Sequence, residues 1–115
     1  MATSTNTKKR TSTSTLPRVA ANEMGKLPPQ ALELEESVLG ALLIEKDAFA
    51  TIADLLRPES FYSVQHSVIF EAIRSLAAKD APIDILSVVE QLRSSGDLEK
   101  AGGVVYLSEL TRRVA

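Results

Sequence analysis

The sequence predicts an all-α fold of about five helices, and three observations support this. Apolar residues recur at helical spacing through most of residues 27–112. The strict alternation of apolar and polar residues that is typical of a half-buried strand is absent from the sequence. Residue types that start and stop helices stand at the ends of the periodic segments. At 115 residues, the chain forms one domain at most.

Residues 27–44 are the predicted central helix. Pro28 and Pro29 favour an extended entry. The apolar stripe comprises Ala31, Leu34, Val38, Ala41 and Leu42, widened by Leu32, Leu39 and Leu43. Because this helix is apolar over much of its circumference, other helices must cover it. Gly40 costs about 1 kcal/mol relative to alanine in mid-helix, which favours close approach of a second helix there.

Three acids, Glu33, Glu35 and Glu36, lie in the first two turns of this helix, where the helix dipole favours negative charge. Their spacing does not place all three on one side, so we interpret them as a solvated acidic surface and not as a cation site. Glu33 is a candidate contact for a basic partner.

The second and third helices follow. Asp47 is a predicted N-cap of a short helix that ends at Arg57 and Pro58. Its inward residues are predicted to be Phe49, Ile52, Leu55 and Leu56. Ser63 is predicted to cap a longer helix that runs to about Ala78. The inward stripe of that helix is His66, Ile69, Phe70, Ile73, Leu76 and Ala77.

Two further helices complete the prediction. Asp84 is the expected N-cap of the fourth helix and Gly96 its left-handed stop. The inward residues of this helix are Ile85, Val88, Val89 and Leu92. Leu98 should hold the next loop against the core, and Gly102 and Gly103 should allow a sharp turn. The fifth helix begins at about Val104.

Residues 1–26 form a Ser/Thr-rich basic leader that should be disordered, since it has few large apolar residues to bury. Its function is either a tether or phosphate-seeking arm, or none. Five basic residues against one acidic residue give the leader a charge of +4, so the remaining residues carry −6 of the total of −2. An acidic body disfavours direct nucleic-acid binding.

Composition also excludes several classes of site. The sequence has no cysteine and one histidine, which makes a metal site improbable. No apolar run is long enough to span a membrane and no signal-peptide core is present, so we expect a cytoplasmic protein. The glycine-rich nucleotide motifs are also absent. We therefore predict no catalytic residue, cofactor or metal in this chain.

Two side chains remain of interest. His66 is predicted to be a hydrogen-bonded core histidine, with a general base or a pH switch as the alternatives. Tyr106 is either an interface residue or an ordinary packing tyrosine. Leu107 and Leu110, on the same terminal helix, are candidates for a self-association face.

With these residues placed, the chain resembles the N-terminal domain of bacterial replicative DNA helicases of the DnaB type. The matching pieces are PPQALELEESVLGALL (28–43), FYSVQHSVIF (61–70), PIDILSVVEQL (82–92) and G-x-L followed by GGVVYLSEL (96–110). They occur in the family's order and cover nearly all of residues 27–112.

The resemblance implies a compact helical domain without ATPase chemistry. In this family it precedes a linker and a motor domain that binds ATP and Mg²⁺. Six copies form a collar in which neighbouring domains pair as dimers. The collar docks the helicase-binding domain of primase, and a helicase loader is a further expected partner. Glu33, Tyr106, Leu107 and Leu110 are the candidate interface residues.

Departures from the family pattern are small. Glu36 and Ser87 stand where the family often has glutamine and threonine. The leader is longer than usual. The family pairs through a helical hairpin, and we expect the chain to contain only its first arm, from about Val104, as a piece of a longer polypeptide. Two alternatives remain: a free-standing helical adaptor that binds primase, helicase or loader, and an enzyme in its own right. Continuation of the gene past Ala115 tests the adaptor, and ATP hydrolysis by the isolated chain tests the enzyme.

Overall fold

The computed structural model describes residues 29–114, and these form helices joined by loops and turns, with no strand among them. The predicted all-α fold with five helices is confirmed. The helices are α2 (Pro29–Ile44), α3 (Ala48–Ile52), the 3-10 helix η1 (Pro58–Ser60), α4 (Val64–Ala78), α5 (Ile85–Ser95) and α6 (Gly103–Val114). The leader of residues 1–26 lies outside the described residues.

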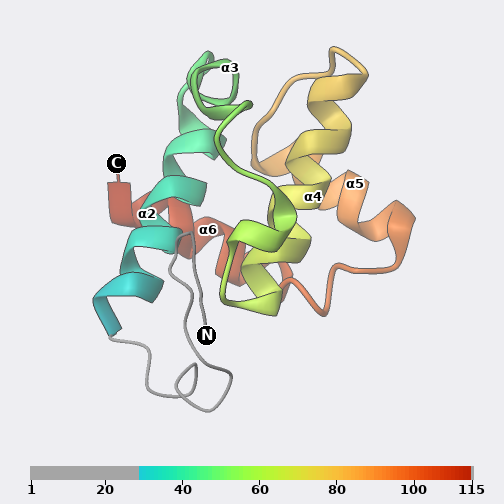
Figure 1. The fold of residues 1–115 in the computed structure, drawn as a ribbon. Coiled ribbons are helices and arrows are strands. Elements are labelled where there is room, and N and C mark those ends of the chain that lie inside the picture. The colour runs from blue at the N-terminus through green and yellow to red at the C-terminus, as the bar shows by residue number, and fades with distance from the viewer. Residues whose placement is uncertain (1–28, 115) are drawn as a thin grey trace, which may run out of the picture.

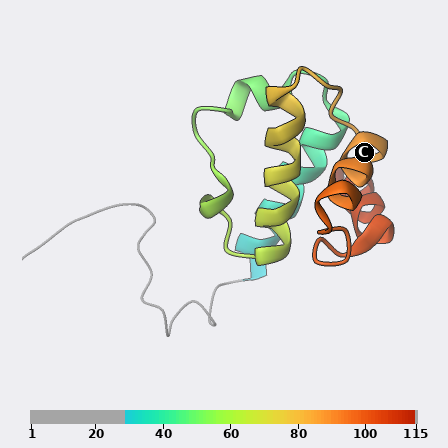
Figure 2. The same ribbon diagram turned by 90° about the vertical axis from the view of Figure 1, so that its right-hand side faces the viewer.

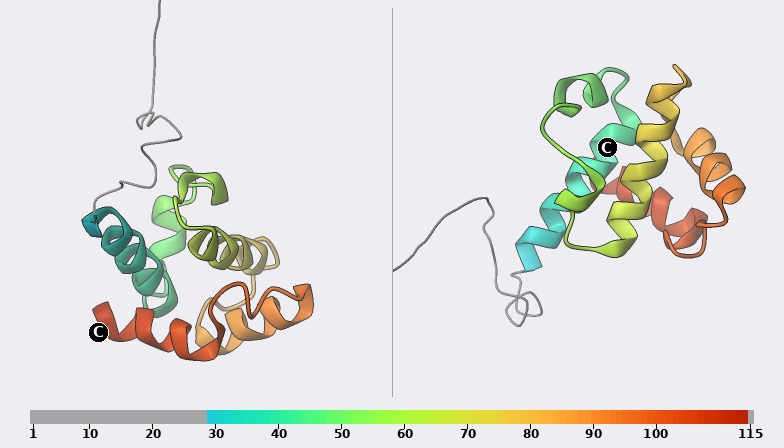
Figure 3. Two further views of the ribbon diagram at one scale, coloured as in Figure 1. Left: turned by 90° about the horizontal axis from the view of Figure 1, so that it is seen from below. Right: turned by 45° about the vertical axis from the view of Figure 1, so that its right-hand side comes forward.

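The helices form two layers. In Figure 1, α2 and α4 stand beside each other, with α3 at their upper end. Figure 3 shows α5 and α6 on one side of this pair, so that α6 packs on α2 and α5 packs on α4. Figure 2 shows the segment with η1 running beside α4 in the opposite direction. The central position predicted for the first helix is confirmed, because α2 contacts α3, α4 and α6.

Local signals set the ends of α4 and α5. The Ser63 side chain accepts a hydrogen bond from the His66 backbone N–H at 3.3 Å, and Asp84 Oδ1 accepts one from Ser87 N–H at 2.8 Å. Both contacts satisfy backbone donors that a helix start leaves without a partner. Gly96 closes α5 in the left-handed conformation, at φ 79°. The caps predicted at Ser63, Asp84 and Gly96 are confirmed.

One continuous core lies between the layers. Its fully buried large side chains are Phe70, Leu39, Ile69, Ile73, Leu92, Leu107, Leu110 and Val88. The inward stripe predicted for α4 is confirmed, with Ala77 half-buried at its end. The prediction was wrong for two leucines: Leu34 is 65 % exposed and Leu55 is 75 % exposed. On α2 the core is made by Leu39, Leu42 and Leu43 instead.

The second helix is shorter than predicted. Asp47 stands at its N-cap position, but its side chain makes no capping hydrogen bond. Instead the Asp47 carbonyl oxygen accepts a long hydrogen bond of 3.4 Å from the Thr51 hydroxyl. The helix ends at Ile52, so Leu55 lies in the turn that follows and not on a helical face.

Gly40 lies at a close approach of α2 and α6. A Cβ atom at this position would overlap the backbone carbonyl oxygen of Leu110 and stand 3.1 Å from Cγ2 of Val114. A backbone atom inside a helix cannot move aside as a flexible side chain can. The close approach predicted from the mid-helix glycine is therefore confirmed, and the partner is α6.

Candidate functional site

A chain of polar side chains links α2, α4 and α6 beside the core. His66 on α4 is 3 % exposed. Its Nδ1 lies 2.7 Å from Glu35 Oε1 on α2, and its Nε2 lies 2.5 Å from the Tyr106 hydroxyl on α6. The His66 and Tyr106 rings are nearly parallel, with centroids 5.9 Å apart. The prediction of a hydrogen-bonded core histidine is confirmed.

The hydrogen-bond partners of His66 determine which of its ring nitrogens carries the proton. An ionised carboxylate accepts hydrogen bonds but cannot donate, so Nδ1 carries a proton and donates it to Glu35. With a neutral ring, Nε2 accepts the single proton of the Tyr106 hydroxyl, for which Glu36 Oε2, at 3.4 Å, is a second and more distant acceptor. Both ring nitrogens are then satisfied, as burial of a polar group requires.

Glu35 also holds the start of α4. Its Oε2 accepts a hydrogen bond of 2.6 Å from the Tyr62 backbone N–H, and its Oε1 a longer one of 3.4 Å from Ser63 N–H. Its side chain is 14 % exposed. One carboxylate on α2 therefore fixes both the buried histidine and the backbone that leads into α4.

Glu36 makes a second link, to α6. Its Oε1 lies 3.0 Å from Nε of Arg113, and its Oε2 lies 3.4 Å from the Tyr106 hydroxyl. The Glu36 side chain is 24 % exposed and that of Arg113 is 42 % exposed. This ion pair is therefore at the surface, where such pairs contribute little to stability.

The prediction of a solvated acidic surface was wrong for Glu35 and Glu36. Of the three acids, Glu33 is exposed, and Glu35 and Glu36 are half-buried. A signal for Glu35 was present in the sequence, because it lies four and seven residues before the core residues Leu39 and Leu42 and so shares their face. Its partners, 27 to 31 residues further along the chain, carried no local signal.

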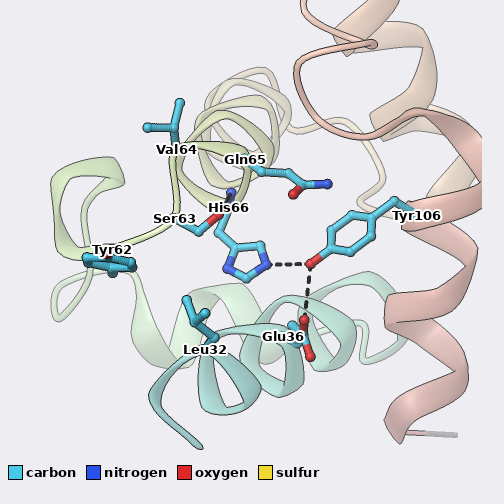
Figure 4. A pocket seen from close by; sticks show the side chains of 8 residues that line it. All are labelled: Leu32, Glu36, Tyr62, Ser63, Val64, Gln65, His66 and Tyr106. Atoms are coloured by element: carbon cyan, nitrogen blue, oxygen red, sulfur yellow. Dashed lines mark hydrogen bonds between the residues drawn. The ribbon is translucent and has the colours of Figure 1, made fainter. Parts of the chain in front are cut away.

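A pocket of about 650 Å³ opens to solvent beside this network. Figure 4 shows Leu32 and Glu36 on α2, Tyr106 on α6, and His66 between them, with Tyr62 and Val64 on the opposite wall. The lining residues are Leu32, Glu36, Tyr62, Ser63, Val64, Gln65, His66 and Tyr106. The pocket thus combines a polar floor with apolar walls, an arrangement that suits a side chain of a partner protein.

The four predicted interface residues are divided between surface and core. Glu33 is exposed, and Tyr106 is half-buried in the pocket wall. Leu107 and Leu110 are both 0 % exposed, inside the core. We predicted a self-association surface at these two leucines. In the structure they lie on the side of α6 that packs in the core, so they are not available for contact with another protein. The apolar residues that α6 exposes are Val104, Val105 and Val114.

The side chains of this site make contacts between helices. Within residues 29–114, no group of three or more His, Asp or Glu side chains is placed to hold a metal ion. In the same range, no helix is long and apolar enough to cross a membrane. Both ring nitrogens of His66 are hydrogen-bonded to side chains on neighbouring helices, so this residue joins α2, α4 and α6. The candidate site is therefore the open pocket beside the network.

The environment of Tyr106 predicts a loss of stability at alkaline pH. Burial, and then the charge and hydrogen bond of Glu36, raise the pKa of Tyr106 to about 12, against the lowering effect of Arg113. An unfolded tyrosine has a pKa of about 10. Above pH 10 the unfolded chain therefore loses a proton that the folded chain keeps. The resulting stabilisation is fully present below pH 10 and is lost as the pH rises to about 12.

Urea unfolding at pH 9 and pH 11 measures this effect, with Tyr106→Phe as the control. The free energy of unfolding should fall more between the two pH values in the wild-type chain than in the variant, which has no phenol to titrate. Equal losses in both proteins would contradict the assignment.

Comparisons with known proteins place this domain in context. The family model described as the DnaB-like helicase N-terminal domain matches residues 27–115. The chain is 50 % identical over 93 residues to the replicative DNA helicase DnaB of Rhodothermus marinus, an alignment that covers 81 % of the chain and 10 % of that protein. It is 40 % identical over 89 residues to the DnaB of Geobacillus stearothermophilus, covering 77 % of the chain and 20 % of that protein.

A solved structure is similar as well. The crystal structure of the N-terminal domain of DnaB helicase from Mycobacterium tuberculosis superposes with a TM-score of 0.72 at 40 % identity, over 76 % of this chain and 61 % of that one. The chain spans a tenth to a fifth of the length of the two curated relatives described above.

Proposed function

Because the chain belongs to the DnaB-like helicase N-terminal domain family, we propose that it acts as the non-catalytic assembly and docking domain of a replicative DNA helicase. Its role is to shape a hexamer and to hold the helicase-binding domain of primase beside the emerging strand. The observation that carries the proposal is the family match over residues 27–115, which includes all of the described helices.

The surface supports the docking half of the proposal. The pocket of about 650 Å³ is open to solvent, and Tyr106 forms part of its wall. Glu33 is exposed one turn from Glu36 on the same helix. Together they give a basic partner an acidic contact and a recess for a side chain. The same surface is available to a helicase loader.

The exposed surface of α6 supports the self-association part of the proposal. Val104 is 44 % exposed and Val105 is 75 % exposed, so the helix presents apolar surface outside the core. Isolated exposed apolar residues are common, but adjacent ones suit a protein contact. We propose that pairing of neighbouring domains uses this outer surface of α6 in place of Leu107 and Leu110.

The remaining activities belong to the rest of the helicase. We propose that a motor domain in the same polypeptide binds ATP and Mg²⁺ and unwinds duplex DNA in the bacterial cytoplasm. Residues 27–115 have a charge of −6, which disfavours strong contact with phosphates. This domain then needs no cofactor for its own role.

Calorimetric titration with the primase helicase-binding domain tests the proposal. We expect saturable binding by this chain and by the full-length natural protein, and no ATP hydrolysis by this chain alone. Absence of heat and of chemical-shift changes with both proteins would contradict primase docking. Hydrolysis by the purified chain would contradict the non-catalytic assignment.

A further inference from the structure

The pocket beside Tyr106 has the chemistry of a receptor for a basic side chain. We propose that it accepts one arginine of the docking partner, with the guanidinium on Glu36 and the alkyl stem along the apolar rim. This inference rests on the proposed docking function and specifies the chemistry of its partner.

Glu36 supplies the acceptor. Its Oε1 is paired with Arg113, but its Oε2 has only the long contact of 3.4 Å to the Tyr106 hydroxyl. A carboxylate oxygen has two lone pairs, so Oε2 retains capacity for a further donor. Glu35 is not among the residues that line the pocket, and its two oxygens face His66 and the backbone N–H groups of Tyr62 and Ser63.

The walls of the pocket fit the rest of an arginine. Tyr62 and Tyr106 offer aromatic rings, and guanidinium groups favour aromatic faces. Leu32 and Val64 form an aliphatic rim, with Val64 67 % exposed. Long basic side chains bury their methylene groups on such surfaces while the charged end finds a polar partner. Figure 4 shows how these side chains lie around His66, with Tyr106 on one side and Tyr62 and Val64 on the other.

Charge complementarity selects a basic occupant over an acidic or neutral one. Glu36 is the charged residue among the eight that line the pocket, and none of the eight is a lysine or arginine. Arg113 approaches Glu36 from α6 and is not part of the pocket lining. The surrounding domain, residues 27–115, carries −6. This distribution of charge favours a cation over an anion in the pocket, although Arg113 offsets part of the charge of Glu36.

Titration of the primase helicase-binding domain into variants of this chain tests the partner surface. We expect Glu36→Gln and Val64→Ser each to weaken binding by about tenfold or more. Two controls are matched to them. Arg113→Gln breaks the same ion pair as Glu36→Gln but leaves the carboxylate, so binding should be unchanged or tighter. Leu86→Ser removes an equally exposed apolar side chain, 74 % exposed on α5, and should have no effect.

A small probe tests the chemistry of the pocket without primase. N-acetyl-arginine amide should shift the NMR signals of Tyr106 and Val64 in the wild-type chain and in Arg113→Gln. The shifts should disappear in Glu36→Gln. N-acetyl-citrulline amide, which is neutral and of similar shape, should give no shifts in any of them.

The outcomes separate this inference from the function on which it rests. Primase binding that is unaffected by Glu36→Gln and Val64→Ser would overturn the inference and leave docking intact. Equal shifts with arginine and citrulline probes would overturn the arginine assignment. Loss of primase binding by every protein, with arginine-selective shifts retained, would overturn primase docking but support the pocket as a receptor for a basic side chain.

Discussion

Phe70→Ala is expected to lower the free energy of unfolding by about 3 to 5 kcal/mol, as truncation of a fully buried phenylalanine does. Phe70 is 0 % exposed. Its ring packs against Phe61, with centroids 5.1 Å apart, and against Phe49, with centroids 6.0 Å apart. The variant would leave a cavity between α3, α4 and the η1 segment. Urea unfolding followed by circular dichroism measures the loss.

Leu34→Ala is the matched control for Phe70→Ala. The spacing of apolar residues assigned Leu34 to the core, but the structure leaves it 65 % exposed. Substitutions at such surface positions usually change stability by no more than about 0.5 kcal/mol. A large loss for Leu34→Ala together with an unchanged melting temperature for Phe70→Ala would show that the helix registers are wrong.

Glu35→Ala is the substitution with the next largest expected effect. It removes the acceptor of His66 Nδ1 and of the Tyr62 N–H at the same time. Leaving a buried donor without its acceptor costs about 1 to 3 kcal/mol for each donor, and more where the bond was to a charged group. Two donors lose their acceptor here, but the Glu35 side chain is 14 % exposed and water replaces part of what is lost, so we expect about 3 kcal/mol. Chemical denaturation at pH 7 measures the change.

Two further variants isolate the cause. Glu33→Ala removes a carboxylate from an exposed position on the same helix and should leave stability nearly unchanged. Glu35→Gln keeps one oxygen acceptor of the same shape and should lose less than Glu35→Ala. If Glu33→Ala and Glu35→Ala destabilise equally, the network does not stabilise the domain as described.

Features encoded within a few residues were predicted well. The Ser63 and Asp84 caps bond to groups three residues away, and Gly96 stops α5 through its own backbone conformation. Each of these signals is local, so the residues around it are sufficient. The Asp47 cap is the exception, because its side chain makes no capping hydrogen bond. The close approach at Gly40 was also predictable, because a mid-helix glycine has a cost that packing must offset. The identity of the helix that approaches it was not.

Features that depend on distant residues were missed. Glu36 meets Tyr106 across 70 residues of chain, and Glu35 meets His66 across 31. The spacing of apolar residues also gave a wrong prediction on α2. Leucines occur on several sides of this helix, so the spacing alone did not show that Leu34 lies on the side exposed to solvent. The same limit applies to Leu107 and Leu110, whose apolar character fits a core and an interface equally well.

The packing of α6 on α2 has a consequence for folding during synthesis on the ribosome. The chain is made from its N-terminus, so α2 is complete long before Leu110, whose carbonyl lies against Gly40. Until then the apolar face of α2 that α6 covers remains open to water or to other proteins. Contacts between residues far apart in sequence also form slowly. The nascent chain is therefore most vulnerable to proteolysis and aggregation just before α6 emerges, and this interval is where chaperones would have most effect.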